Sequence, residues 1–182
     1  MKRIVADPTK CLACRGCEIA CALAHAATDD LVVALFKEGA KPRIFIESAG
    51  KFAVPLQCRH CDDAPCVTVC PTGAVSRTSD SEPVLVDQAK CVGCEFCVEV
   101  CPFGVILVVP RGKSGVPGEA GAGKAVIKCD LCQDRQTEGL DPACVSACPV
   151  GALLFEDVDN RARSARARAA ARAAASAGDG IS

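Results

Sequence analysis

The sixteen cysteines are the residues of this chain whose type and spacing point most directly to chemistry. The third run of cysteines has the spacing C-x2-C-x2-C-x3-C and is followed by proline, which is typical of ligands to [4Fe–4S] clusters. The sequence therefore predicts four such clusters, with every cysteine as a metal ligand. The cysteines form four groups, with none left over: Cys11, Cys14, Cys17 and Cys21; Cys58, Cys61, Cys66 and Cys70; Cys91, Cys94, Cys97 and Cys101; and Cys129, Cys132, Cys144 and Cys148.

The spacing also predicts how the groups share ligands. In two-cluster ferredoxins, three thiolates of a group bind one cluster and the fourth binds the cluster of the neighbouring group. The shortest connection joins the second and third groups, so we expect these to form an inner pair and the first and fourth groups an outer pair. The expected ligand sets are set 1 (Cys11, Cys14, Cys17, Cys148), set 2 (Cys129, Cys132, Cys144, Cys21), set 3 (Cys58, Cys61, Cys66, Cys101) and set 4 (Cys91, Cys94, Cys97, Cys70).

The elements that must position these ligands are short. Pro71, Pro102 and Pro149 each follow a closing cysteine and precede a variable residue, a glycine and two apolar residues, which predicts a short helix, a turn and the start of a strand. Residues 18–36 favour a helix with a break near residues 28–30. Apolar runs favour strands at residues 42–47, 52–57, 83–87 and 105–109.

Two segments are compositionally distinct from the cysteine repeats. Residues 110–124 are rich in Gly and Pro and favour a mobile loop or a hairpin tip. Residues 161–177 contain only Ala, Arg and Ser, which favours a solvated helix, a docking helix or a disordered tail. We expect residues 22–57 to be the first candidate for a docking surface, and residues 110–124 the second.

Composition and charge exclude several classes of protein. The chain has no Trp, no Tyr and six Phe, so we expect metal sites to supply folding energy that a thin core lacks. The net charge is −1, of which residues 161–182 contribute +4, leaving −5 for the body, a poor charge for nucleic-acid binding. No apolar run is long enough to span a membrane, and no secretory signal is recognisable. We therefore expect a cytoplasmic protein with reduced thiols.

Several motifs resemble those of a known family. Residues 128–132 read KCDLC, residues 143–149 read ACVSACP, residues 58–73 contain CRHC, APC and CPTG, and a KCxxC motif starts at Lys90. Over about residues 2–156 the chain resembles the four-cluster electron-transfer subunits of the dimethyl-sulfoxide-reductase type. The resemblance implies the cross-paired ligand sets above and an α+β fold of two interleaved bacterial-ferredoxin-like modules, with short strands and helices.

The resemblance gives an expected domain organisation. Residues 1–160 would form one four-cluster ferredoxin-like domain. Its inner module would span about residues 53–109, and its outer module would combine about residues 1–36 and 125–157. Residues 161–182 would form a separate Ala/Arg-rich helix or tail.

The expected function is non-catalytic electron transfer. Four clusters in a short chain must lie close together, and four cysteines for each cluster leave no open coordination position for a substrate. By resemblance, the partners would be a catalytic oxidoreductase subunit and a second redox protein or flavin subunit. Tungsten aldehyde oxidoreductase and carbon monoxide dehydrogenase are the first candidates, with formate dehydrogenase or hydrogenase next. A free-standing polyferredoxin carrier is the alternative, and self-association through the Arg-rich tail stays open.

Competing interpretations concern both the cysteines and other residues. A structural zinc module is the alternative for the cysteines, but zinc sites use two well-separated C-x2-C pairs. Residues 118–124 resemble a phosphate-binding loop, but Ala125 stands where a Ser or Thr is required, so we expect a connector. His60 either tunes a cluster or packs locally, and His25 is an ordinary surface or core residue. Lys residues before three ligands, Lys10, Lys90 and Lys128, either offset cluster charge or are solvated.

Overall fold

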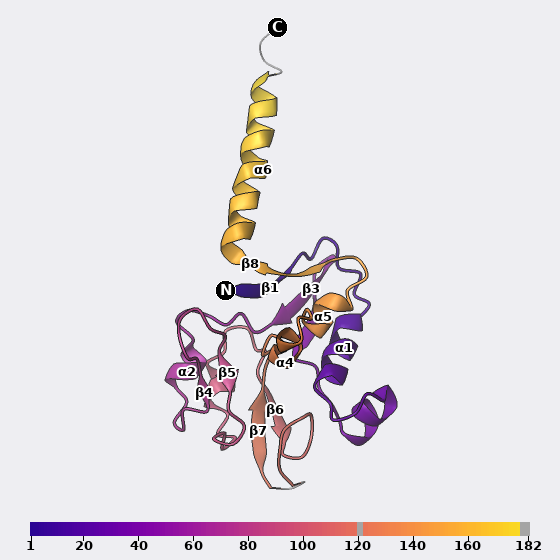
Figure 1. The fold of residues 1–182 in the computed structure, drawn as a ribbon, viewed down its shortest axis with the longest axis vertical. Coiled ribbons are helices and arrows are strands. Elements are labelled where there is room, and N and C mark those ends of the chain that lie inside the picture. The colour runs from indigo at the N-terminus through magenta and orange to yellow at the C-terminus, as the bar shows by residue number, and fades with distance from the viewer. Residues whose placement is uncertain (120–121, 179–182) are drawn as a thin grey trace.

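The computed structural model describes residues 1–119 and 122–178 of the chain. Short strands and helices alternate along most of it, and a long helix ends it (Figure 1). The mixture confirms the predicted α+β class. The strands are β1 (Lys2–Ala6), β2 (Ile44–Ala49), β3 (Phe52–Gln57), β4 (Val75–Ser76), β5 (Leu85–Val86), β6 (Leu107–Pro110), β7 (Lys124–Ile127) and β8 (Leu153–Asp157). The helices are α1 (Gly16–Ala24), η1 (Val33–Lys37), α2 (Pro65–Thr68), α3 (Phe96–Glu99), α4 (Gln133–Thr137), α5 (Ala143–Ser146) and α6 (Val158–Gly178).

The described strands form four separate antiparallel pairs. The pairs β1–β8 and β4–β5 occupy equivalent places in the repeat. Strand β8 follows the fourth cysteine group and pairs with β1, which precedes the first group. In the same way β4 follows the second group and pairs with β5, which precedes the third group. The pairing thus joins the first group to the fourth and the second to the third.

Buried residues gather in two main cores, and cysteines belong to both. One core contains Cys91 and Cys97 with buried residues of β4, β6 and β7. The other contains Cys17, Cys21 and Cys144 with buried residues of β1, β2 and β8. The buried side chains around the thiols are mostly Ala, Val, Ile and Leu. Each core therefore shields its cysteines from solvent with small aliphatic groups and without aromatic side chains between the thiols.

The segment predicted as one broken helix contains two short helical elements. Helix α1 ends at Ala24, and the π-helical turn η1 begins only at Val33. Between them, Asp30 Oδ1 accepts hydrogen bonds from the backbone N–H groups of Val32 and Val33 at 2.8 and 2.9 Å. This capping interaction starts a new helical turn, as is typical of Asp at a helix N-terminus. The predicted break is confirmed, and the helical segments are shorter than expected.

Residues 110–124 connect β6 to β7 as a hairpin, in agreement with the prediction of a hairpin tip. The described part of this connection packs against the segment that follows α1. Ser114 and Val116 are buried, and Ser114 Oγ donates to the Gly39 carbonyl at 2.8 Å. A Cβ atom on Gly115 would lie 2.3 Å from the carbonyl oxygen of His25, so this close approach requires glycine. The two segments predicted as docking surfaces therefore contact one another, while residues 120–121 lie outside the described part.

Helix α6 projects away from the rest of the molecule, as Figure 1 shows in yellow. Its side chains are mostly exposed as far as Ala175, and Arg161 is joined to Glu156 by an ion pair of 2.5 Å. A helical tail was one of the predicted alternatives, and residues 179–182 lie outside the described part. Within the described ranges, no helix has the length and apolarity needed to cross a bilayer.

Candidate metal centres

Tight loops present the cysteines, and several of their residues have left-handed backbone conformations. Positive φ angles occur at Arg15, Glu95 and Cys132, each of which directly precedes a short helix of a cysteine group. Gly93 lies between two ligands with φ 68°, and a Cβ atom there would lie 2.6 Å from the Lys124 carbonyl oxygen. These left-handed residues allow tight turns beside and between the cysteines, so that thiols close in sequence can face one space.

Two cavities are each lined by four thiols from different parts of the sequence. The first contains all members of set 1 and is otherwise bounded by residues such as Leu12, Ile46 and Pro55. The second contains all members of set 3, with apolar neighbours such as Val84 and Val105. In both, the fourth thiol comes from a distant cysteine group, as the crossing rule predicts.

The thiols of set 2 influence one another electrostatically at short range. Burial raises the pKa of Cys144, and the nearby Cys129, Cys21 and Cys132 raise it further. All four members of set 2 are buried. The sequence-predicted residues of this set are therefore brought together.

In set 4, electrostatic influence of this kind links three of the four thiols, Cys91, Cys94 and Cys97. Burial raises the pKa of Cys97 to about 11, with further contributions from Cys66, Cys91 and Cys94. Cys70 is placed instead by its hydrogen bonds. Its sulfur accepts a bond from the Val75 N–H at 3.4 Å, and such bonds hold its pKa below the usual value although burial opposes them.

The sets also neighbour one another in a series. The charge of Cys17 in set 1 raises the pKa of Cys144 in set 2. In the same way, Cys58 of set 3 raises the pKa of Cys129 in set 2. Cys66 of set 3 raises the pKa of Cys97 in set 4. Each set therefore has a thiol near a thiol of the next set in the series 1, 2, 3, 4.

Backbone N–H groups point at several of the cysteine sulfurs. Such bonds favour the thiolate form and set the potential of a sulfur-ligated centre. The closest is the Ala152 N–H, at 3.2 Å from the sulfur of Cys148. The remaining donor and sulfur pairs, at 3.3–3.5 Å, are Arg43 to Cys21, His60 to Cys58, Val75 to Cys70 and Leu131 to Cys129.

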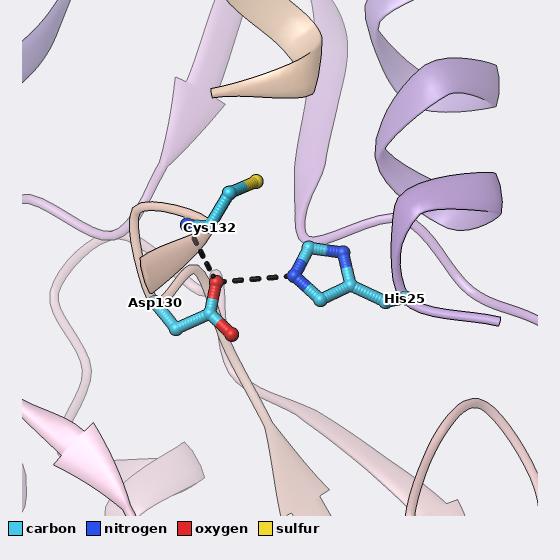
Figure 2. A group of neighbouring side chains, drawn as sticks. All are labelled: His25, Asp130 and Cys132. Carbon is cyan, nitrogen blue, oxygen red and sulfur yellow. Dashed lines mark hydrogen bonds and ion pairs between the residues drawn. The ribbon is translucent and has the colours of Figure 1, made fainter. Parts of the chain in front are cut away.

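A charged network lies against set 2 (Figure 2). His25 Nε2 lies 3.1 Å from Asp130 Oδ1, and Arg43 pairs with the other oxygen of the same carboxylate. His25 Nδ1 donates to the Cys21 carbonyl at 2.7 Å, and the Cys132 N–H donates to Asp130 Oδ1 at 2.9 Å. The network thus fixes the backbone at two cysteines of set 2.

The network also determines the charge of its members. Burial opposes protonation of His25, but hydrogen bonds with Asp130, Cys132 and Cys21 raise its pKa to about 12. Burial likewise opposes ionisation of Asp130, but His25 and Arg43 hold its pKa below the usual value. The expectation that His25 is an ordinary surface or core residue is therefore incomplete. Asp130 and Arg43 were not selected from the sequence, although Asp130 lies inside the KCDLC motif.

Lys128 differs from the other two lysines that precede a cysteine. It is 3% exposed, and its Nζ donates to the backbone carbonyls of Val84 and Cys129. Lys10 and Lys90 are exposed, and each lies near an aspartate three residues earlier in the chain. The predicted alternative of a solvated lysine holds for those two, whereas Lys128 joins the backbone before β5 to that of set 2.

The donor sets fit [4Fe–4S] clusters. All sixteen thiols are free of disulfide bonds. The two cavities bring four sulfurs each to an apolar space, and the sulfurs of several cysteines accept N–H bonds, as ligated thiolates do. Neutral thiols are readily buried in apolar surroundings, whereas burial disfavours the charged thiolate. A bound metal centre would therefore be needed to hold these buried sulfurs in the ionised form.

Comparisons with known proteins agree with this chemistry. Residues 50–158, more than half of the chain, match the 4Fe-4S dicluster domain. The match contains the second, third and fourth cysteine groups. The chain belongs to this family of iron–sulfur proteins, which favours iron over the zinc alternative.

Named relatives extend over most of the chain. An iron-sulfur protein of Rhodospirillum rubrum is 43% identical over 172 residues, covering 91% of this chain and 88% of its own. Electron transport protein HydN of Escherichia coli K12 is 42% identical over 158 residues, with coverage of 85% and 87%. Thiosulfate reductase electron transfer subunit PhsB of Salmonella typhi is 35% identical over 154 residues, with coverage of 84% and 74%. The chain is therefore an iron–sulfur electron-transfer protein of a non-catalytic kind.

Proposed function

We propose that sets 1 to 4 each bind one [4Fe–4S] cluster and that the chain relays electrons along the four sites. The observation that carries this proposal is that set 1 and set 3 each line a single cavity with all four of their thiols. The mutual influence of the set 2 thiols, and of three set 4 thiols with Cys66 beside them, supports the remaining assignments. A bound cluster of this type supplies a centre that gains and loses one electron without exchanging ligands.

The protein's own residues hold and shield these centres. Sixteen thiols must lose their protons on metal binding, so assembly releases protons and supplies folding free energy. Burial, which raises the pKa of Cys17 to about 11, makes this deprotonation depend on the metal. The backbone N–H donors at Cys21, Cys58 and Cys148 then stabilise the ligated sulfurs.

Exposure of the thiols suggests where electrons enter and leave. Cys14 of set 1 and Cys94 of set 4 are exposed, whereas set 2 is wholly buried. Since sets 1 and 4 also stand at the two ends of the series 1, 2, 3, 4, we infer that partner proteins exchange electrons there. The inner sets then provide the connection between the two surfaces.

The partners belong to the same proposal. We infer that the chain is an electron-transfer subunit of the dimethyl-sulfoxide-reductase type and that one partner is a catalytic oxidoreductase subunit, with tungsten aldehyde oxidoreductase and carbon monoxide dehydrogenase as first candidates. The other would be a second redox protein or flavin subunit. The name of PhsB, an electron transfer subunit of thiosulfate reductase, supports a subunit role of this general kind. A cytoplasmic location and the boundary near residue 160 stay predictions.

Anaerobic EPR of the reduced protein tests the relay. We expect signals broadened by magnetic coupling between neighbouring clusters, because the four sets adjoin in order. Narrow, uncoupled signals would contradict a continuous relay. Purification of the native complex and mass spectrometry of its subunits would test the partner: a catalytic oxidoreductase subunit is expected, whereas a chain that always elutes alone would favour the free-standing carrier.

A further inference from the structure

His60 is buried in an unusual way for a polar side chain. It is 1% exposed, and neither Nδ1 nor Nε2 has a hydrogen-bond partner among the described residues. Buried polar groups are nearly always paired, because leaving one unpaired costs the full desolvation penalty of that group. If the ring only filled space, an apolar side chain would do so without burying two unpaired nitrogens. The presence of a histidine here therefore requires an explanation.

The other described side chains with an unpaired buried atom do not share this property. Each of them uses another of its atoms in a hydrogen bond. Arg43 pairs with Asp130, Gln57 Nε2 donates to the Ile4 carbonyl, Arg77 donates to the Cys61 carbonyl, and Gln88 Nε2 donates to the Val126 carbonyl. His60 alone within this group has every polar side-chain atom unpaired.

The position of His60 indicates what its partner is. The residue lines the same cavity as the four thiols of set 3, beside apolar residues such as Val84 and Ile106. Its own N–H donates to the sulfur of Cys58 at 3.4 Å, and its φ of 49° is a conformation that non-glycine residues rarely adopt. The ring therefore lies at this cavity, where no described side chain accepts a hydrogen bond from it.

The backbone acceptor beside the ring is the Val84 carbonyl, which already accepts a hydrogen bond from the Lys128 ammonium. Although this carbonyl lies near the ring, neither ring nitrogen forms a hydrogen bond of acceptable geometry with it. A neutral imidazole carries one N–H donor. A buried sulfur-rich anion, as a cluster with four thiolates is, would be the acceptor that this donor lacks.

The geometry points to His60 as the residue that donates a side-chain N–H···S hydrogen bond to the cluster of set 3 and thereby raises its reduction potential. This inference rests on the proposed function, because it needs a cluster at set 3. A hydrogen bond to cluster sulfur stabilises the more negative, reduced form and so shifts the potential upward. His60 would distinguish set 3 from set 2, whose nearby His25 is already paired with Asp130 and the Cys21 carbonyl.

Two substitutions test the inference in the full-length, cluster-loaded protein. His60→Leu removes the donor, and His60→Gln retains an N–H donor; both place a non-glycine side chain at the same positive φ, so backbone strain is matched. We expect one cluster potential to become more negative in His60→Leu and to return toward the wild-type value in His60→Gln. Gln57→Leu is the control, because it removes a buried polar side chain next to Cys58 that bonds to Ile4 instead of lining the cavity.

A spectroscopic measurement separates this role from a structural one. The chain has two histidines, so 15N-histidine labelling is selective. Pulsed EPR of the reduced protein should detect 15N coupling to the set 3 cluster, and His60→Leu should abolish it while His25→Gln retains it. Two results in protein with full iron content would overturn the inference but leave the proposed function intact: cluster potentials in His60→Leu equal to those of the wild type, and no 15N coupling in the wild-type protein. Protein without iron would instead overturn the proposed function.

Discussion

The backbone N–H of Asp7 donates a hydrogen bond to the carbonyl of Ala152 at 2.8 Å, joining the start of the first cysteine group to the end of the fourth. The equivalent bond in the other half of the molecule runs from Asp87 to Ala74 at 2.7 Å. The two bonds continue the pairs β1–β8 and β4–β5. This matched arrangement supports ligand sharing within an outer and an inner pair of cysteine groups.

Cys101→Ser tests that sharing. Cys101 lines the cavity of set 3, although it stands in the same cysteine group as Cys91, Cys94 and Cys97. We expect the substitution to alter or abolish the EPR signal of the cluster at set 3 and to leave that of set 4 nearly unchanged. Cys94→Ser is the matched control and should do the reverse. Loss of the set 4 signal in Cys101→Ser would contradict the crossed assignment.

Lys128→Met tests the buried lysine. It keeps most of the side-chain volume but leaves the carbonyl oxygens of Val84 and Cys129 without their charged donor. We expect a loss of about 1–3 kcal/mol in the free energy of unfolding, measured by anaerobic denaturant titration of the cluster-loaded protein.

Lys90→Met provides the matched control for Lys128. Lys90 also precedes a cysteine, but its side chain is 63% exposed, and its pair with Asp87 lies 3.3 Å apart. An exposed pair of this kind contributes little to stability, so we expect a clearly smaller loss than in Lys128→Met. Equal losses in the two variants would show that burial of Lys128 is unimportant to stability.

Asp130→Ala tests the charged network beside set 2. The substitution leaves the largely buried Arg43 and His25 side chains without their carboxylate. Breaking such a pair costs on the order of 3 kcal/mol, and we expect faster loss of the set 2 cluster in a chelator challenge followed by EPR. Asp62→Ala is the control, since Asp62 also follows a cysteine but is 85% exposed in its pair with Arg3. A similar effect of both changes would contradict the role of the network.

Removal of residues 163–182 tests the tail. Helix α6 projects from the body, and the ion pair between Arg161 and Glu156 would be retained. We expect iron content and the unfolding midpoint of the body to stay close to those of the full chain, measured by metal analysis and denaturant titration. A large loss of iron would instead make the helix part of the cluster-binding fold and would shift the predicted domain boundary.

Local features of the fold could be predicted from the sequence, whereas contacts between distant residues could not. The cysteine spacing is a local pattern, so the short helices of the repeat could be predicted from it, and they are confirmed as α2, α3 and α5. The assignment of the cysteines as ligands stays a prediction. The strand pair of residues 42–47 and 52–57 was also predicted, and it is confirmed as β2–β3. Strand β1 was missed, although its β-branched Ile4 and Val5 next to the start of the repeat were a usable signal.

Long-range polar contacts could not be predicted in the same way. Arg43 and Asp130 are far apart in sequence, and neither lies in a periodic pattern, so only the folded chain brings them together. The burial of Ser114 and Val116 is another example, because a Gly- and Pro-rich composition predicts a turn but does not identify the surface it packs against. Lys128 shows the same limit, since its motif looks like that around Lys90 while its surroundings differ.

Quantitative iron and acid-labile sulfide analysis of anaerobically purified protein tests the central claim most directly. Four clusters predict about 16 iron and about 16 sulfide per chain. About eight iron, with a fully folded protein, would contradict the count of four clusters. About four zinc and no sulfide, one metal for each thiol set, would contradict the iron–sulfur assignment altogether.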